Sequence, residues 1–122
     1  MLTEARRSLP NECCGLLGGQ GRTVTRVFQA ANVLASPVSY EIRPRELFAL
    51  VRRLREEKLE LVGIYHSHPA GDNYPSARDC ERAYYPDAAY VILSPRADAP
   101  RPLRAFQLVE GSVEELSVEI LD

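Results

Sequence analysis

Two histidines, His66 and His68, follow a short apolar run at 61–65 and are the only histidines in the chain. Because side chains alternate along an extended strand, both imidazoles point to one side and Ser67 points to the other. Two imidazoles one strand repeat apart can bind a single metal ion. Asp79, eleven positions after His68, offers a carboxylate as a third ligand. Two nitrogen ligands, one oxygen ligand and an open fourth position are typical of a catalytic zinc site.

Each of these motifs also has an interpretation without a metal. A His-x-His pair at a strand end can be two half-exposed imidazoles with ordinary hydrogen bonds. Ser76 and Asp79, which follow Pro75, match a serine N-cap with an acidic residue three positions later, close to a capping box. The occurrence of both motifs in one short stretch favours the metal site over either interpretation taken alone.

Glu12 opens a segment that is otherwise small and apolar, where an unpaired charge is costly. It lies either at an exposed strand end or in a site with a cation nearby. Zinc would lower the pKa of a bound water molecule toward neutrality, and Glu12 could take its proton and pass it to a leaving amine. Ser76 shares a helix face with Asp79 and could donate its hydroxyl to a developing oxyanion. The spacing alone does not bring Glu12 near the histidines.

Several other catalytic schemes lack the residues they need. The chain has no His-Glu-x-x-His helix of the thermolysin type, and it lacks the His-x-Glu and Cys-x-x-Cys motifs of the zinc deaminases. A cupin-like site would need a further histidine. A Cys–His pair or a Ser–His–Asp triad stays open, but either would leave the paired spacing of the histidines unused.

Size and composition predict one domain over residues 1–122. The net charge of −2 gives no indication of a nucleic-acid surface, and no stretch approaches a membrane span or a secretion signal. Three cysteines, Cys13, Cys14 and Cys80, make a disulfide framework improbable, so we expect small buried thiols and a reducing cytoplasm. A homodimer is compatible with the sequence, which does not determine the oligomeric state.

The hydrophobic pattern predicts a mixed α/β sheet flanked by helices. Strand 59–68 is apolar on both sides and therefore belongs in the middle of a covered sheet. The last strand is expected to be half-buried, with Leu116, Val118 and Ile120 on its inner side. The elements expected are helices at 2–8, 44–58 and 76–84, and strands at 12–19, 23–28, 40–42, 59–68, 90–93, 103–109 and 113–121.

The combined motif resembles the JAMM motif of the MPN-positive (JAB1/MPN/Mov34) metalloproteases. That motif consists of a glutamate, then His-Ser/Thr-His-Pro, then Ser-x-x-Asp, with ten residues between the second histidine and the aspartate. This chain matches the motif in full with Glu12, His66-Ser67-His68-Pro69 and Ser76-Ala77-Arg78-Asp79. Positions 69–78 are the ten residues between His68 and Asp79. The order of elements is similar to that of the small stand-alone prokaryotic members.

The resemblance implies an MPN-like fold with cytidine-deaminase-like layers. It also implies that His66, His68 and Asp79 bind Zn2+, that Glu12 is the general acid and base, and that Ser76 stabilises the tetrahedral intermediate. The implied reaction hydrolyses the peptide or isopeptide bond after the carboxyl-terminal Gly-Gly of a ubiquitin-like or sulfur-carrier protein, releasing cysteine or a lysine-linked product; of these substrates we favour the sulfur carrier.

Two alternatives to this activity remain at the level of the sequence. One is a catalytically silent MPN scaffold that only binds partners, and the other is an amidohydrolase acting on a small amide. The chain retains all the motif positions, whereas scaffolds of this fold typically lose ligands. The intact motif therefore favours the enzyme.

Overall fold

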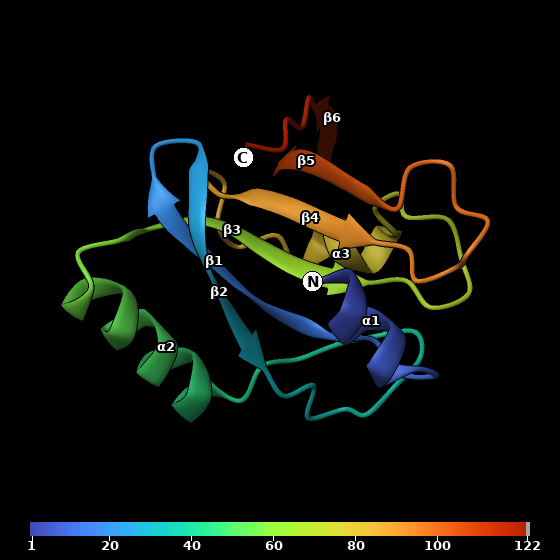
Figure 1. Ribbon diagram of the computed structural model, residues 1–122, viewed down its shortest axis with the longest axis horizontal. Coiled ribbons are helices and arrows are strands. Elements are labelled where there is room, and N and C mark those ends of the chain that lie inside the picture. Colours follow the sequence, from blue (N-terminus) through green and yellow to red (C-terminus); the bar gives the residue numbers. More distant parts are fainter. Residues whose placement is uncertain (122) are drawn as a thin grey trace.

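A six-stranded mixed β-sheet with the strand order β2-β1-β3-β4-β5-β6 organises the chain (Figure 1). The computed structural model describes residues 1–121. These residues form, in chain order, α1 (Leu2–Ser8), β1 (Cys14–Gln20), β2 (Thr23–Ala30), α2 (Pro44–Glu56), β3 (Glu60–Ser67), α3 (Ala77–Glu81), β4 (Ala89–Leu93), β5 (Leu103–Val109) and β6 (Ser112–Leu116). The predicted α/β architecture is confirmed.

Strand β3 lies inside the sheet, antiparallel to β1 and parallel to β4. Its central place agrees with the prediction from its two apolar sides. Because parallel neighbours need a crossover connection, the chain leaves the sheet after Ser67 and returns at Ala89. The crossover contains the loop at 69–75 and α3, so the folding pattern itself carries the Ser-x-x-Asp motif back over the end of β3 (Figure 1).

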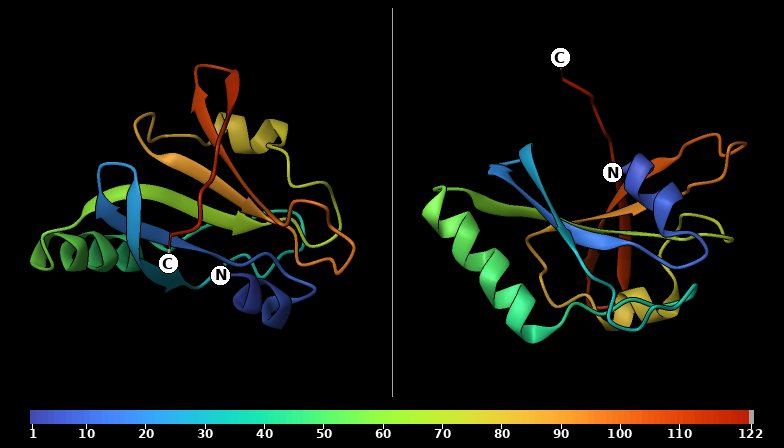
Figure 2. Two further views of the ribbon diagram at one scale, coloured as in Figure 1. Left: turned by 45° about the horizontal axis from the view of Figure 1, so that its top comes forward. Right: turned by 60° about the horizontal axis from the view of Figure 1, so that its bottom comes forward.

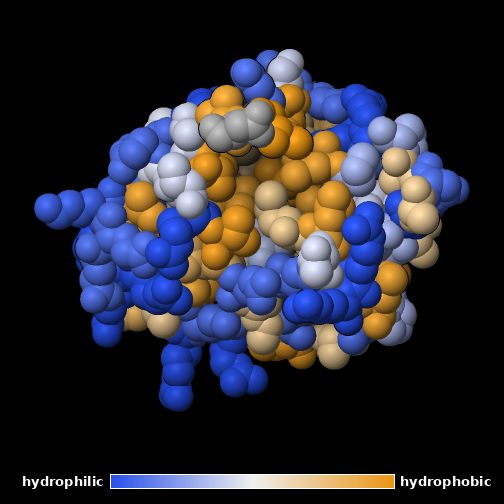
Figure 3. All heavy atoms as spheres, viewed as in Figure 1, coloured by the Kyte–Doolittle hydropathy of each residue, from blue (hydrophilic) through white to orange (hydrophobic). Residues whose placement is uncertain are grey.

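Helices cover the two faces of the sheet unequally (Figure 2). Helices α2 and α3 lie on one face, where Leu50 and Leu54 of α2 join a core with Ile64 and Phe106 of the sheet. Within residues 1–121 the one helix on the other face is the short α1, whose Ala5 packs in a second cluster of the core. Figure 3 shows this second face, where hydrophobic side chains gather over the middle of the sheet inside a rim of hydrophilic ones.

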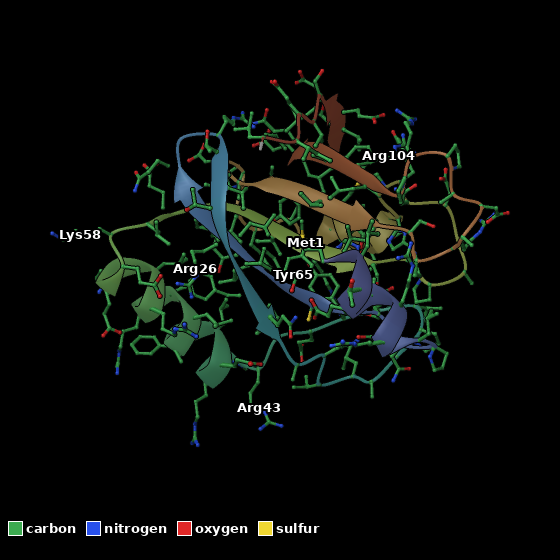
Figure 4. All side chains as sticks on the ribbon, in the orientation of Figure 1. Met1, Arg26, Arg43, Lys58, Tyr65 and Arg104 are labelled. Atoms are coloured by element: carbon green, nitrogen blue, oxygen red, sulfur yellow. The ribbon has the colours of Figure 1, made fainter. Side chains whose placement is uncertain are left out.

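Tyr65 connects β3 to α1 on that second face. Its ring is fully buried beneath the helix (Figure 4), and its hydroxyl donates a hydrogen bond to Glu4 Oε1 at 2.6 Å. Gly15 on β1 leaves the space for this ring, because a Cβ there would lie 2.5 Å from the Tyr65 hydroxyl oxygen. A glycine and a tyrosine on neighbouring strands thus fix how β1 and β3 pack under α1.

Two predicted boundaries are wrong near the candidate site. Residues 40–42 form no strand, because the backbone of Glu41 is bonded to the turn at 32–33 instead: its N–H donates to Asn32 Oδ1 at 3.1 Å and its carbonyl accepts from Val33 N at 3.0 Å. Helix α3 ends at Glu81 rather than continuing to residue 84. Beyond it, the N–H of Tyr85 donates to the Tyr90 hydroxyl at 3.1 Å and directs the chain toward β4.

The carboxyl-terminal prediction is also partly wrong. Strand β6 ends at Leu116, where its pairing with β5 ends opposite Ala105, and the following residues have no strand partner among those described. Val118 and Ile120 are 49% and 87% exposed, so the predicted half-buried side does not form.

Smaller differences concern the helix ends and the cysteines. Helix α2 ends two residues before the expected position, at Glu56. The three thiols are free, with Cys13 and Cys14 buried as expected and Cys80 partly exposed. No helix within residues 1–121 is both long and apolar enough to cross a lipid bilayer.

Candidate metal centre

His66 and His68 lie where β3 leaves the sheet. His66 is the last but one residue of β3 and pairs with Cys14 of β1, whereas His68 follows the strand and is held by its N–H, which donates to the Leu93 carbonyl at 2.9 Å. Both rings turn to the same side, and their Nε2 atoms are 3.1 Å apart. The His66 side chain is buried in the core. The predicted alternation of the two histidines and Ser67 is confirmed.

Asp79 reaches the two imidazoles from the first turn of α3. Its Oδ1 lies 3.2 Å from His66 Nε2 and its Oδ2 lies 3.1 Å from His68 Nε2. A complete capping box fixes this turn: Ser76 Oγ accepts from the Asp79 N–H at 3.1 Å, and Asp79 Oδ2 accepts from the Ser76 N–H at 2.9 Å. The capping interpretation of the motif is therefore confirmed, and the same cap aims the carboxylate at the histidines.

The arrangement of these donor atoms fits a cation. Ligand atoms of His66, His68 and Asp79 all lie within 4.8 Å of one another. His68 Nδ1 is 2.7 Å from the carbonyl oxygen of Asp72, and since a carbonyl only accepts, Nδ1 carries the proton. In neutral His68, Nε2 then presents a lone pair to the carboxylate oxygen of Asp79. Two facing acceptors need a proton or a metal cation between them, and the set of two imidazole nitrogens and one carboxylate fits a zinc ion.

The pKa shifts in the cluster follow from burial and from the short contacts. Burial lowers the pKa of His66 and keeps its imidazole neutral. Burial also acts to lower the pKa of His68, but the hydrogen bonds to Asp79 and to the Asp72 carbonyl outweigh it and raise the value. For Asp79, burial acts to raise the pKa, and the hydrogen bonds from both histidines reverse this and hold it well below its usual range. The Asp79 carboxyl group is therefore a carboxylate at neutral pH.

Glu12 lies immediately before β1 and is buried, with 5% of its surface exposed. Of the two alternatives left open by the sequence for Glu12, an exposed strand end is therefore excluded. Its carboxylate accepts no hydrogen bond from any residue in 1–121, while His68, Asp79 and Arg78 are close enough for their charges to act on it. Burial raises the pKa of Glu12 to about 7. The charge of His68 acts to lower this pKa, and the negative charge of Asp79 acts to raise it further.

Ser67 connects Glu12 to the histidine pair. Pointing away from the imidazoles, its Oγ accepts from the Cys13 N–H at 2.9 Å, and its N–H donates to the Cys13 carbonyl at 3.1 Å. Glu12 directly precedes Cys13. Its N–H donates to the Ser36 carbonyl, and its carbonyl accepts from Asn32 Nδ2. The pairing of β1 with β3 thus brings together residues 54 positions apart in the chain.

Several groups that support the site were not identified from the sequence. The Tyr40 ring stacks on His66, with ring centroids 4.6 Å apart and an angle of 21° between the planes. His66 Nδ1 is the only buried side-chain polar atom without a hydrogen-bond partner in the described part of the chain, so on that side of the ring stacking on Tyr40 takes the place of a hydrogen bond. The hydrogen bond from His68 to the Asp72 carbonyl could not be predicted from the sequence, because every residue has a backbone carbonyl. The only indication in the sequence that Tyr40 could support the site is its aromatic side chain.

The loop at 69–75 is fastened to the sheet from its centre. Asn73 is 5% exposed, and its Nδ2 donates to the carbonyls of Arg101 at 2.7 Å and Ile92 at 3.3 Å. Next to it, the Asp72 carboxylate lies 3.6 Å from Arg104, which stacks over Tyr74 and pairs with Glu115. These contacts hold the Asp72 carbonyl where His68 needs its acceptor.

A pocket opens on the α3 side of the cluster. His66 and Asp79 form part of its wall, and Tyr40 and Ser39 continue it. The remaining lining residues are Val38, Arg78, Arg82 and Tyr90. The candidate centre therefore borders a pocket that combines aromatic and cationic side chains.

The chain is similar to characterised proteins over most of its length. The family described as prokaryotic homologs of the JAB domain matches residues 1–109. A desampylase of Haloferax volcanii is 44% identical over 114 residues, which cover 91% of this chain and 79% of that protein. A CysO-cysteine peptidase of Mycobacterium tuberculosis is 35% identical over 124 residues, covering 100% of this chain and 85% of that protein.

Solved structures show the same fold. A protein from Desulfitobacterium hafniense superposes with a TM-score of 0.80 at 36% identity, covering 95% of this chain and 82% of that one. A JAB1/MPN domain protein from Archaeoglobus fulgidus superposes with a TM-score of 0.65 at 17% identity, covering 99% of this chain and 90% of that one. The second likeness shows that the described sheet and helices form an MPN fold.

Proposed function

The chain belongs to the prokaryotic JAB branch of the JAMM/MPN metalloproteases, and on this basis we propose that it is a zinc-dependent isopeptidase. Its proposed reaction is hydrolysis of the bond that follows the carboxyl-terminal glycine of a ubiquitin-like or sulfur-carrier protein. The single observation that supports this most is the convergence of His66, His68 and Asp79 beside the buried carboxylate of Glu12.

The proposed ligands are Nε2 of His66, Nε2 of His68 and a carboxylate oxygen of Asp79. Zinc bound by three protein ligands supplies a Lewis acid that makes a water molecule acidic enough to lose a proton near neutral pH. The Asp72 carbonyl supports this assignment because it keeps the proton of His68 on Nδ1 and leaves Nε2 free.

Glu12 is the proposed general base and general acid. A carboxylate that accepts no protein hydrogen bond has both oxygens available to take a proton from water and to return it to the leaving amine nitrogen. A pKa of about 7, raised by burial, suits transfer in both directions near neutral pH, although a bound cation would lower it.

Ser76 is proposed to stabilise the oxyanion of the tetrahedral intermediate. A hydroxyl group has one donor proton and two acceptor lone pairs, and the helix cap uses only an acceptor position. The Oγ–H proton therefore remains available to a substrate oxygen. Capping α3 and assisting catalysis are compatible roles for this residue.

The proposed substrates follow from the two relatives, one named a desampylase and the other a CysO-cysteine peptidase. The second name describes a peptidase that acts on a CysO-cysteine substrate. We favour a sulfur carrier as the substrate, with a carboxyl-terminal Gly-Gly bonded to cysteine.

Incubation of the zinc-loaded protein with a carrier ending in Gly-Gly-Cys, with and without chelator, tests the proposal. We expect chelator-sensitive release of cysteine by the wild-type protein and none by Glu12→Gln at unchanged zinc content. A protein that binds the carrier but hydrolyses neither its Gly-Gly-Cys form nor its lysine isopeptide would instead be a silent scaffold. Equally fast hydrolysis of a short Gly-Cys amide would identify a small-amide hydrolase.

A further inference from the structure

We infer that Arg78 and Arg82 form a carboxylate-binding subsite beside the metal centre, and that its ligand is the free α-carboxylate of the amino acid released from the carrier. This inference rests on the proposed function and makes it more specific. It assigns to the chain a preference for a single terminal amino acid over a lysine side chain of a conjugated protein.

The position of the two arginines supports the inference. Arg78 directly precedes the proposed ligand Asp79, and Arg82 follows one helical turn later, with its N–H donating to the Arg78 carbonyl at 3.0 Å. Residues four apart on a helix share a face. Both residues line the pocket whose wall also includes the proposed ligands His66 and Asp79, so the pocket borders the centre.

The charges in this pocket lack internal compensation. Neither Arg78 nor Arg82 takes part in an ion pair or a side-chain hydrogen bond within residues 1–121, whereas Arg104 on the adjacent side of the site pairs with Glu115. Arg78 lies in α3 and Arg82 is the C-cap of this helix, so two like charges stand one helical turn apart and repel each other. An anion bound in the pocket would offset the repulsion.

The chemistry of the scissile bond identifies the anion. In an amino acid linked through its α-amine, the carboxylate is attached to the same Cα as the leaving nitrogen, so it must lie close to the centre. In a lysine isopeptide the leaving nitrogen is at the end of the side chain, and the lysine carbonyl is part of a peptide bond. A guanidinium group binds a carboxylate through two parallel hydrogen bonds, which a neutral amide cannot accept equally well.

Three substrates built on one carrier test the subsite: Gly-Gly-Cys with a free acid, the same sequence with a carboxyl-terminal amide, and Gly-Gly linked to the Nε of lysine. For the wild-type protein we expect kcat/KM for the acid to exceed that for the amide about 10- to 100-fold, the range for hydrogen bonds to a charged group. The lysine isopeptide should resemble the amide.

Variants assign the preference to the two arginines. In Arg78→Ala and Arg82→Ala the acid-to-amide ratio should fall toward one, and Arg78→Lys should retain part of it. The ratio is the appropriate measure because the charge of Arg78 also acts on Glu12, and this effect is common to both substrates. The matched control is Arg55→Ala, an exposed arginine on α2 away from the pocket, which should keep the wild-type ratio.

Equilibrium binding separates failure of the subsite from failure of the proposed reaction. Titration of Glu12→Gln with the acid and the amide should show the same preference for the acid. If none of the three substrates is cleaved and Glu12→Gln still prefers the acid, the proposed hydrolysis fails and the subsite stands. A wild-type ratio near one, equal binding of acid and amide, or an unchanged ratio in the Arg78→Ala/Arg82→Ala double variant would overturn the inference.

Discussion

Replacing Asn73 with alanine tests how the loop before α3 positions His68. The substitution removes the hydrogen bonds from Nδ2 to the carbonyls of Arg101 and Ile92, at 2.7 and 3.3 Å, and leaves both carbonyls without this donor. At about 0.5–1.5 kcal/mol for each hydrogen bond, the free energy of unfolding should fall by about 1–3 kcal/mol. The loop then no longer holds the Asp72 carbonyl against His68 Nδ1.

The loosened carbonyl should also weaken metal binding. Loss of an outer partner of a metal-bound histidine typically lowers metal affinity about 10- to 100-fold. We therefore expect Asn73→Ala to bind zinc about 10- to 100-fold more weakly than the wild-type protein. Competition against a chromogenic chelator measures this affinity, and urea denaturation of the metal-free protein measures the stability.

Asn32→Ala is the matched control. Asn32 also donates through its side-chain amide to two backbone carbonyls, those of Glu12 and Ser39, at 3.2 and 3.0 Å, but it supports Glu12 rather than His68. Its Oδ1 also accepts from the N–H groups of Leu34 and Glu41, so its replacement should cost at least as much stability and reduce turnover while leaving the zinc affinity within about threefold of wild type. If Asn73→Ala lost stability and kept the wild-type zinc affinity, the loop would not position His68 and the reasoning would be refuted.

Four further outcomes are expected. Glu12→Gln should lower kcat by at least about 100-fold with zinc content unchanged, since it removes the proton carrier and no ligand; full activity would remove Glu12 from the mechanism. His68→Ala should lose both zinc and activity, as measured by metal analysis and cysteine release, and retained zinc would show that His68 is not a ligand. Ser76→Ala should cost about 1 kcal/mol of stability through the lost cap and about 100-fold in kcat; normal turnover of the folded fraction would leave only the cap. Burial raises the pKa of Glu4, and the hydrogen bond from Tyr65 opposes this. The native state therefore keeps the Glu4 carboxyl proton to a higher pH than the unfolded chain, in which the pKa is 4.5. Stability contributed by Glu4 is therefore present below about pH 4.5 and declines as pH rises through the native pKa, and Glu4→Gln should flatten that decline in denaturation series across pH; an identical pH dependence in both proteins would contradict this assignment.

The parts of the site that could be predicted from the sequence depend on local geometry. Strand alternation places His66 and His68 on one side whatever the rest of the chain does. The capping box places Asp79 in the first turn of α3 because all its contacts lie within four residues. Both predictions needed only neighbouring residues.

The parts that could not be predicted depend on long-range packing. Nothing local brings Glu12 to the histidines, since that requires β1 to pair with β3. The role of Tyr40 as a stacking partner of His66 cannot be predicted from local pattern because it is a tertiary contact. The alternation of Val118 and Ile120 indicated which side chains share a face, but alternation does not indicate whether anything covers that face.

Ser67 divides the centre into a fixed half and an adaptable half. Its hydroxyl and N–H bind both backbone groups of Cys13, so Glu12 and His66 belong to one rigid unit of the sheet. Asp79, Ser76 and Arg78 come instead from the crossover between β3 and β4, which is not part of that unit. The spacing of Glu12 and His66 is thus set by the sheet, whereas His68, through the Asp72 carbonyl, and Asp79 depend on how the crossover lies over it.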